Sequence, residues 1–123
     1  MEKILTIGMA TYDDYDGVYF TIQSLRMHHP ICNTDAVEIL VIDNNPESAH
    51  GKANADFIKH VKNGKYIPYK VKTGTAVRNE IFKQAKGKYC ISMDCHVLFC
   101  QDAIQTLLKY YDKQEDCKDI VQG

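Results

Sequence analysis

The chain has 123 residues, with 15 lysines and arginines against 16 aspartates and glutamates, a formal net charge of −1 and 45% hydrophobic residues. These values predict one globular domain and exclude a disordered or fibrous chain, because domains usually contain roughly 100–200 residues with enough apolar side chains to form a core. The balanced charge argues against broad binding to nucleic-acid phosphates, and no apolar run approaches the ~20 residues of a membrane span.

The first half of the chain predicts two strand–helix units. Residues 4–10 form an apolar run typical of a strand, and residues 37–42 form a second run that is apolar on both faces, as in a buried parallel strand. Apolar residues at helical spacing follow each run, namely Val18, Ile22 and Leu25 after the first, and Ala53, Phe57 and Val61 after the second. We expect the first helix to end at His28-His29-Pro30 and the second at Asn63-Gly64.

The second half predicts two more units. Residues 66–71 predict a short strand, and Pro68 places it at a sheet edge because proline has no backbone N–H to donate. A helix is expected next, ending near Gly87, which suits a left-handed cap. Residues 89–93 predict a strand, and residues 119–121 predict the start of another. The last two helices are predicted from apolar residues at helical spacing: Val77, Ile81 and Ala85, and then Ile104, Leu107, Leu108 and Tyr111 after a cap near Asp102.

Strand–helix alternation repeated four times predicts an α/β fold with a mainly parallel sheet and helices on both faces. In such sheets, ligands bind beyond the carboxyl ends of the strands. Polar and charged residues follow each predicted strand, at 11–16, 43–45, 73–79 and 94–96. The sequence therefore predicts a site for a polar, charged small molecule at this edge.

Asp94 and His96 come directly after the fourth predicted strand. Residues i and i+2 of an extended segment point to the same side, so this carboxylate and this imidazole could share a divalent cation. Such a pair favours Mn²⁺ over Mg²⁺, because imidazole is a poor partner for hard Mg²⁺. The alternative is a surface turn with two polar residues, and the pair taken alone favours that alternative.

Three other residues at the same edge each have two interpretations. Asp43 could accept a hydrogen bond from a base or ribose, or it could cap the turn of residues 44–46. Tyr12 could stack on a flat ring, or it could be a half-buried loop tyrosine. Arg78, in the first turn of its predicted helix, could bind phosphate, or it could lie on a solvated helix face.

The five cysteines bear on the cellular location of the protein more than on a catalytic or metal-binding role. Residues 1–10 run straight into an acidic loop, which is too short for a signal peptide, so reduced thiols and a cytoplasmic protein are expected, with peripheral membrane association as the alternative. A thiol nucleophile at Cys95 is disfavoured because no separate base is identified to orient it. A structural zinc site is disfavoured because no CxxC pair occurs among the nearby candidates, Cys90, Cys95, His96 and Cys100.

Three motifs, taken in order, resemble the N-terminal nucleotide-binding half of family 2 glycosyltransferases with the GT-A fold. Residues 9–13, Met-Ala-Thr-Tyr-Asp, resemble the first-strand signature, with Ala10 in place of the usual proline. Residues 39–44 resemble the second-strand signature, and residues 76–96 resemble the ARN…A-x-G-x-Y…LDxD motif, with His96 as a DxH variant. The resemblance implies a three-layer, Rossmann-like nucleotide-diphospho-sugar-binding domain over residues 1–123.

The resemblance also implies roles for these residues. Tyr12 would lie near the base, Asp43 would accept the N3–H of a uracil, and Arg78 would lie near the phosphates or ribose. The full nucleotide-binding set is Thr11, Tyr12, Asp13, Asp43, Arg78 and Asp94, and the metal ligands are Asp94 and His96. The implied reaction is inverting transfer of a sugar from a metal-bound nucleotide diphosphate, with UDP favoured over GDP and dTDP, to an unknown saccharide, lipid or protein acceptor.

The catalytic base is expected outside this sequence. Members of the family also carry an acceptor site and a carboxylate that deprotonates the acceptor hydroxyl, and no residue here can be named for that role. We therefore expect the base beyond Gly123 and the chain to be truncated before the acceptor-binding half. One alternative is a nucleotide-sugar binding module without turnover of its own. A sugar nucleotidyltransferase is disfavoured, because residues 12–15 are acidic and aromatic and offer no phosphate cradle.

Overall fold

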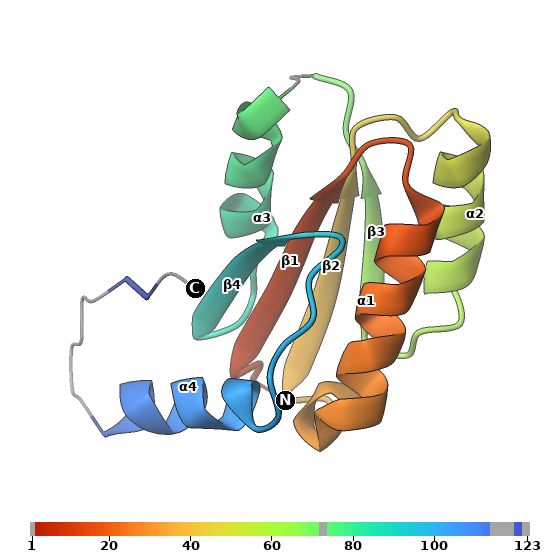
Figure 1. Cartoon of the computed structure of the whole chain (residues 1–123). Helices are drawn as coiled ribbons and strands as arrows, with labels where there is room; N and C mark the ends of the chain where they lie inside the picture. The colour runs from red at the N-terminus through yellow and green to blue at the C-terminus, as the bar shows by residue number, and fades with distance from the viewer. Residues whose placement is uncertain (1, 72–73, 114–119, 122–123) are drawn as a thin grey trace.

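The computed structural model describes residues 2–71, 74–113 and 120–121 (Figure 1). Strands and helices alternate along the chain as predicted. The strands are β1 (Leu5–Thr11), β2 (Val37–Asp43), β3 (Gly64–Pro68) and β4 (Tyr89–Asp94). The helices are α1 (Tyr15–His28), α2 (Ala49–Ile58), α3 (Arg78–Gln84) and α4 (Ala103–Asp112), with 3₁₀ turns η1 (Pro30–Asn33) and η2 (Gly74–Val77).

The four strands form one sheet in the order β3-β2-β1-β4, and every neighbouring pair is parallel. This confirms the predicted α/β fold, and β3 lies at an edge as Pro68 indicated. The register pairs Thr11 with Asp43 and Ala10 with Asp94. The carboxyl ends of the three strands β1, β2 and β4 are therefore level with one another, which places the residues that follow them at one edge of the sheet.

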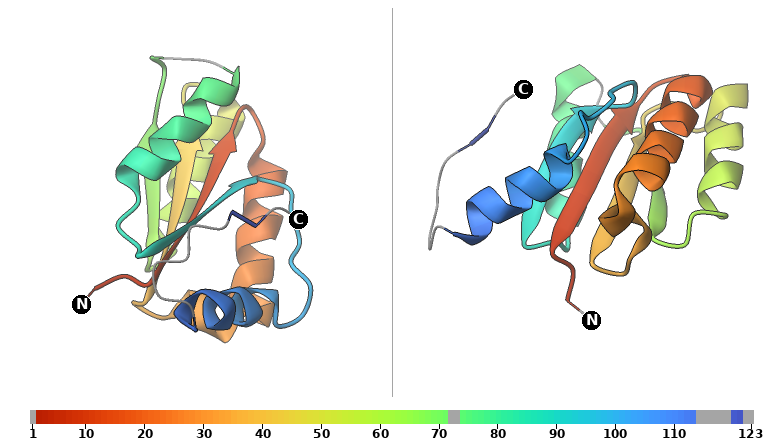
Figure 2. Two further views of the ribbon diagram at one scale, coloured as in Figure 1. Left: turned by 90° about the vertical axis from the view of Figure 1, so that its left-hand side faces the viewer. Right: turned by 60° about the horizontal axis from the view of Figure 1, so that its bottom comes forward.

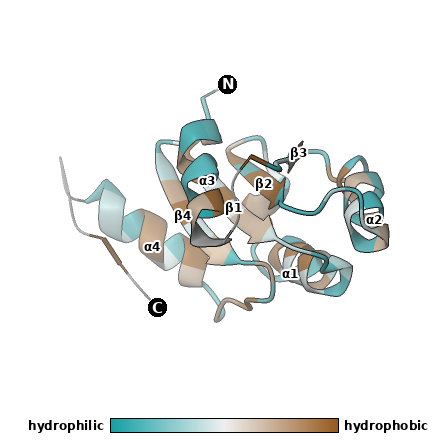
Figure 3. Ribbon diagram, turned by 90° about the horizontal axis from the view of Figure 1, so that it is seen from above, coloured by the Kyte–Doolittle hydropathy of each residue, from teal (hydrophilic) through white to brown (hydrophobic). Residues whose placement is uncertain are grey.

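Helices cover both faces of the sheet, giving the three layers that the resemblance implied (Figures 2 and 3). On one face, alternate residues of β1 and β2 pack with α1, α2 and α4 in a single apolar core, which includes Ile7, Ile39 and Ile104. On the other face, Ile42 packs with Val77 and with Ile81 of α3. Burial of these side chains is the main favourable contribution to the stability of the sheet.

The bounds of β3, α2 and α3 differ from those predicted. β3 begins at Gly64 rather than at residue 66, because Gly64 opens the strand opposite Ile39 and does not cap α2. α2 ends earlier than predicted, at Ile58. α3 ends at Gln84, because Ala85 adopts an extended backbone with ψ 131°. Periodicity thus found the elements, and local backbone geometry decided where they end.

The prediction of a left-handed cap at Gly87 is wrong, since its φ does not lie in the positive range. Glycine is needed there for a different reason. A Cβ atom at Gly87 would lie 2.5 Å from the backbone N of Thr6 and 2.6 Å from the carbonyl carbon of Leu5. The segment that leads into β4 therefore passes directly against the backbone of β1, where only glycine fits.

The C-terminal predictions have mixed outcomes. Asp102 is the N-cap residue of α4, but it has a left-handed φ of 62° and its side chain makes no capping hydrogen bond. Ile120 and Val121 lie in no strand, and Asp119, the third residue of that predicted element, lies outside the described residues. Within the described parts of the chain, no helix has both the length and the apolar character required to cross a membrane.

Candidate functional site

The predicted site residues gather at the carboxyl edge of the sheet, at the ends of β1, β2 and β4 and the start of α3. In the loop between β1 and α1, the side chain of Tyr12 is 66% exposed and therefore open to a stacking partner. Asp13 has a φ of 53°, a left-handed conformation that aspartate tolerates better than most residues. Thr11, by contrast, is buried, and its hydroxyl donates to the carbonyl oxygen of Asp14 at 3.3 Å.

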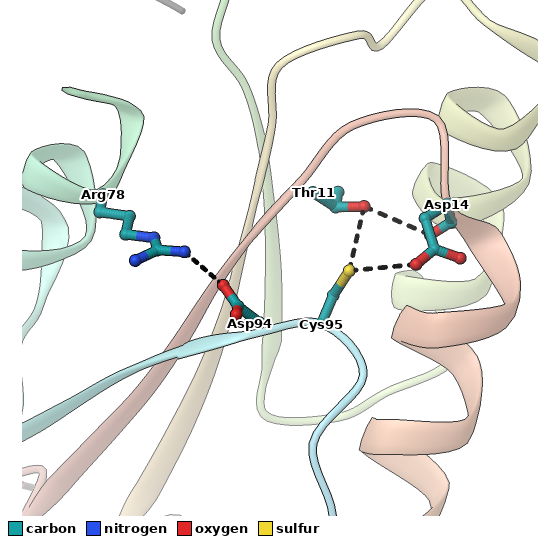
Figure 4. A network of polar contacts seen from close by, with 5 residues as sticks. All are labelled: Thr11, Asp14, Arg78, Asp94 and Cys95. Carbon is teal, nitrogen blue, oxygen red and sulfur yellow. Dashed lines mark hydrogen bonds and ion pairs between the residues drawn. The ribbon is translucent and has the colours of Figure 1, made fainter. Parts of the chain in front are cut away.

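Arg78 and Asp94 form an ion pair at this edge (Figure 4). Nη2 of Arg78 donates to Oδ1 of Asp94 at 2.5 Å, and the two side chains are 48% and 50% exposed. Arg78 is therefore not simply a residue of a solvated helix face, because it points to the end of β4. The ion pair leaves Oδ2 of Asp94 and the remaining guanidinium N–H groups available to a ligand.

The carboxylate of Asp43 is buried and has two partners within the chain. Oδ1 accepts a hydrogen bond from the backbone N–H of Asn45 at 2.9 Å, and Oδ2 accepts one from the hydroxyl of Tyr66 at 2.6 Å. Burial, together with the hydrogen bond to this carboxylate, raises the pKa of Tyr66 well above its usual range. The turn-capping interpretation of Asp43 is confirmed, and its contact with a nucleotide base stays a prediction.

The extended geometry that led us to pair Asp94 with His96 does not continue past Asp94, where β4 ends and the chain turns. Figure 4 shows Asp94 and Cys95 pointing to opposite sides, toward Arg78 and toward Asp14. Among the described residues, three possible ligand atoms, one each from Asp14, Cys95 and His96, lie within 4.8 Å of one another. Asp94 is not a member of that group, so a shared metal between Asp94 and His96 stays a prediction.

Cys95 is buried between the end of β1 and the start of α1. Its thiol donates to Oδ2 of Asp14 at 3.3 Å and lies 3.6 Å from Oγ1 of Thr11. Burial, with a smaller contribution from Asp14, raises the pKa of the Cys95 thiol to about 11. The thiol is therefore protonated at neutral pH, which agrees with the prediction that it is not a nucleophile.

The loop between β1 and α1 is held by residues that the sequence analysis did not single out. Asp14 caps α1 by accepting a hydrogen bond from the N–H of Gly17 at 2.9 Å. From α2, Nδ1 of His50 accepts a hydrogen bond from the N–H of Tyr15 at 3.0 Å, and Asn54 donates to the carbonyl oxygen of Asp14 at 3.3 Å. Asp14 stands before a helical apolar pattern and could have been found as a cap, whereas the contacts of His50 and Asn54 have no local signal.

The comparison with protein families gives the class of this chain. The sequence profile of glycosyl transferase family 2 matches residues 6–122. The chain belongs to this family, which confirms the resemblance carried by the three motifs. No curated protein sequence matches the chain.

Solved structures give the same fold. The chain is similar to S. aureus TarS 1-349, with a TM-score of 0.70 and 16% identity, and to that protein in complex with UDP-GlcNAc, with a TM-score of 0.66 and 15% identity. It is also similar to the mannosyltransferase PcManGT from Pyrobaculum calidifontis in complex with GDP-Man and Mn²⁺, with a TM-score of 0.71 and 14% identity. Each match covers 89% of this chain, and this chain spans about a third, 31% to 32%, of each of those chains.

Proposed function

We propose that this chain forms the donor-binding part of a glycosyltransferase that takes its sugar from a nucleotide diphosphate, and that the donor is a UDP-sugar. The observation that carries the proposal is the ion pair between Arg78 and Asp94 at the carboxyl edge of a family 2 domain, the edge at which the exposed Tyr12 follows β1. This edge is where parallel α/β sheets bind their ligands. It offers an aromatic face, a cation and a carboxylate, which are the groups that a base, a diphosphate and a ribose or metal require.

Each of the nucleotide-binding residues has a proposed contact. Tyr12 stacks on the base, and Arg78 donates to the phosphates or ribose as a charge-assisted partner. Asp43 accepts the N3–H of uracil, since each carboxylate oxygen has a second lone pair beyond the internal hydrogen bond that it accepts. Thr11 and Asp13 line the pocket, and Asp94 contacts the ribose and the metal.

The proposed metal ligands are Asp94 and His96. Both are exposed at the edge of the sheet, and the ion pair with Arg78 engages only Oδ1 of Asp94. Their oxygen and nitrogen donors fit Mn²⁺ better than Mg²⁺. A divalent cation held by Asp94 and His96 would supply positive charge that stabilises the leaving diphosphate.

The proposed transfer inverts the anomeric carbon. The acceptor hydroxyl oxygen attacks that carbon as the bond to the diphosphate breaks, and the bonding electrons leave with the diphosphate. The proton of the hydroxyl passes to a carboxylate base, which we place outside these 123 residues. Within the chain, Arg78 binds the negatively charged diphosphate as it leaves.

The test is calorimetric titration of the chain with UDP, GDP and dTDP, each with and without Mn²⁺. We expect binding that depends on Mn²⁺ and favours UDP. Asp94→Ala and His96→Ala should each abolish the gain in affinity that Mn²⁺ provides. Matched controls are Asp56→Ala and His60→Ala, which remove the same side-chain types at exposed positions on or just after α2, and they should bind as the wild type does.

Three outcomes contradict parts of this proposal. The assignment of the metal ligands would be wrong if Mn²⁺ raised the nucleotide affinity equally in the wild type, in Asp94→Ala and in His96→Ala. Equal affinity for all three nucleotides would remove the assignment of uridine. Absence of binding to any nucleotide, in a chain whose circular dichroism shows it to be folded, would contradict the donor site.

A further inference from the structure

A second group of possible metal ligands lies next to the proposed nucleotide site, on the other side of β4. It consists of a carboxylate oxygen of Asp14, Sγ of Cys95 and an imidazole nitrogen of His96, all within 4.8 Å of one another. Sγ of Cys95 and Oδ2 of Asp14 are 3.3 Å apart. Two ligands of a tetrahedral zinc ion, one sulfur and one oxygen, are separated by about 3.5 Å when their bonds to zinc have normal lengths. Sγ of Cys95 and Oδ2 of Asp14 are therefore already about as far apart as two ligand atoms of one zinc ion.

Hydrogen bonds within the chain hold Asp14 and Cys95 in place. Oδ1 of Asp14 accepts from the N–H of Gly17 as the helix cap, which leaves Oδ2 directed at Cys95. The carbonyl oxygen of Cys95 accepts a hydrogen bond from Oγ1 of Thr21 at 2.8 Å, and both residues are buried. Gly17 permits this approach, since a Cβ atom there would lie 2.3 Å from Oδ2 of Asp14 and 2.7 Å from the carbonyl oxygen of Cys95.

We infer that Asp14, Cys95 and His96 form a site for a thiophilic divalent cation, of which Zn²⁺ is the biological example and Cd²⁺ the probe. Thiolate sulfur and imidazole nitrogen select Zn²⁺, whereas Mg²⁺ and Mn²⁺ prefer oxygen ligands. The site shares His96 with the proposed Mn²⁺ site and differs from it in its other ligands, which are Asp14 and Cys95 in place of Asp94. Three protein ligands leave a fourth position for water, and His96, the exposed member, is where the cation enters.

Binding replaces a proton by a metal. The S–H bond of Cys95 breaks, the sulfur keeps the electron pair and donates it to the cation, and the proton passes to the solvent. The hydrogen bond from the thiol to Asp14 is lost at the same time, and Oδ2 of Asp14 becomes a ligand. Thr11 stays beside the sulfur, with its hydroxyl oxygen 3.6 Å away, and donates to the thiolate when its one O–H turns from the carbonyl oxygen of Asp14.

The test is ultraviolet absorption of the reduced chain during titration with Cd²⁺, in the absence of nucleotide, because cadmium bound to thiolate absorbs where neither component does. We expect an absorption band that saturates at one Cd²⁺ per chain in the wild type. Cys95→Ser should remove it. Cys100→Ser, which changes an exposed free thiol close in sequence, should keep the band with unchanged affinity.

Two further variants keep the test valid if Cys95→Ser does not fold. His96→Gln changes an exposed side chain, and Asp14→Asn keeps a residue that caps helices as well as aspartate does. Both retain the thiol, and each should weaken Cd²⁺ binding by at least ~10-fold, the smallest effect expected when even an outer-shell partner of a metal is lost. Wild-type affinity in both variants, a band that survives Cys95→Ser, or no saturable band in the wild type would each overturn the inference.

One consequence rests on the proposed function. His96 is a ligand in both sites, so Zn²⁺ should lower the affinity for UDP in the presence of Mn²⁺ in the wild type and leave it unchanged in Cys95→Ser. UDP binding that Zn²⁺ weakens equally in both chains would contradict the shared ligand. The Cd²⁺ titration contains no nucleotide, so its result stands whether or not the chain binds a nucleotide diphosphate.

Discussion

The guanidinium of Arg78 and the carboxylate of Asp94 neutralise each other across the edge of the sheet, with Nη2 and Oδ1 2.5 Å apart. The two residues come from α3 and β4, and their proposed partners in the donor have opposite charges. Arg78 is assigned to the phosphates, and Asp94 to the metal. Because the ion pair engages only Oδ1 of Asp94 and one nitrogen of Arg78, the proposed metal and phosphates can bind the remaining atoms of both side chains while the pair stays in place.

Arg78→Ala separates the binding role of this pair from its structural role. Both side chains are about half exposed, so we expect the free energy of unfolding to change by less than about 1 kcal/mol. A charge-assisted hydrogen bond to phosphate contributes more, and UDP affinity should fall ~10–100-fold. Urea unfolding and calorimetry measure the two effects. Lys59→Ala breaks the exposed pair with Asp56 and is the matched control. Equal UDP affinity in Arg78→Ala and Lys59→Ala would contradict the phosphate role.

Tyr12→Ala and Tyr12→Phe test the stacking role of an exposed ring. Because the side chain is 66% exposed, neither change should alter stability by more than about 0.5 kcal/mol. Loss of the ring should weaken UDP binding by about 1–3 kcal/mol, whereas phenylalanine should retain the affinity. Calorimetry measures the UDP affinity of both variants. If the alanine variant binds UDP as tightly as the phenylalanine variant does, Tyr12 does not stack on the base.

Tyr66→Phe should produce a pH-dependent loss of stability. At pH 7 it removes a hydrogen bond to the buried carboxylate of Asp43, and we expect a loss of about 1–3 kcal/mol. Because the pKa of Tyr66 is raised, its phenolic proton is retained to a higher pH in the folded chain than in the unfolded chain. That stabilisation is full below about pH 10 and is lost as the pH rises further.

The difference in stability between wild type and Tyr66→Phe should therefore narrow above about pH 10. Urea unfolding from neutral to alkaline pH measures it. Tyr12→Phe, which removes the hydroxyl of an exposed tyrosine, is the matched control. A difference that stays constant across the alkaline range would show that Tyr66 titrates alike in the folded and unfolded chains.

Gly87→Ala should destabilise the chain by about 1–3 kcal/mol or more, because the added methyl group meets the backbone of β1. Gly64→Ala is the milder comparison, since its Cβ would lie 3.0 to 3.2 Å from side-chain atoms of Val61 and Ile58, which can shift. Thermal unfolding of both variants measures the difference. A loss in Gly87→Ala no greater than that in Gly64→Ala would mean that β1 and the entry to β4 can separate without cost.

The sequence was sufficient to predict the sheet, because its signals are local. β1 and β2 are apolar runs, and the buried face of α1 was predicted from Val18, Ile22 and Leu25, all of which are buried. Gly87 shows where this reasoning fails. Its proximity to the backbone of β1 depends on residues that are about 80 positions away in the chain, and a glycine that permits close approach has the same sequence pattern as a helix cap.

The sequence predicted at which edge of the sheet the site residues lie, but not how their side chains are directed. Strand ends located Asp43 and Asp94 correctly at the carboxyl edge, because parallel strands end together. The direction of each side chain depended on where β4 stops, and the turn at Cys95 directs the thiol toward Asp14, 81 residues earlier in the chain. The partner of Asp43, Tyr66, lies on the neighbouring strand and follows from register, which a single sequence does not contain.

The order of the strands also bears on synthesis of the chain. β1 lies between β2 and β4, and β4 is synthesised after the other three described strands. A nascent chain in which β2 has already paired with β1 and with β3 therefore carries an open row of backbone donors and acceptors along the other side of β1. Such an edge pairs readily with other chains. Pairing of residues 89–94 with β1 covers this edge, and β4 then becomes the edge strand on that side of the described sheet.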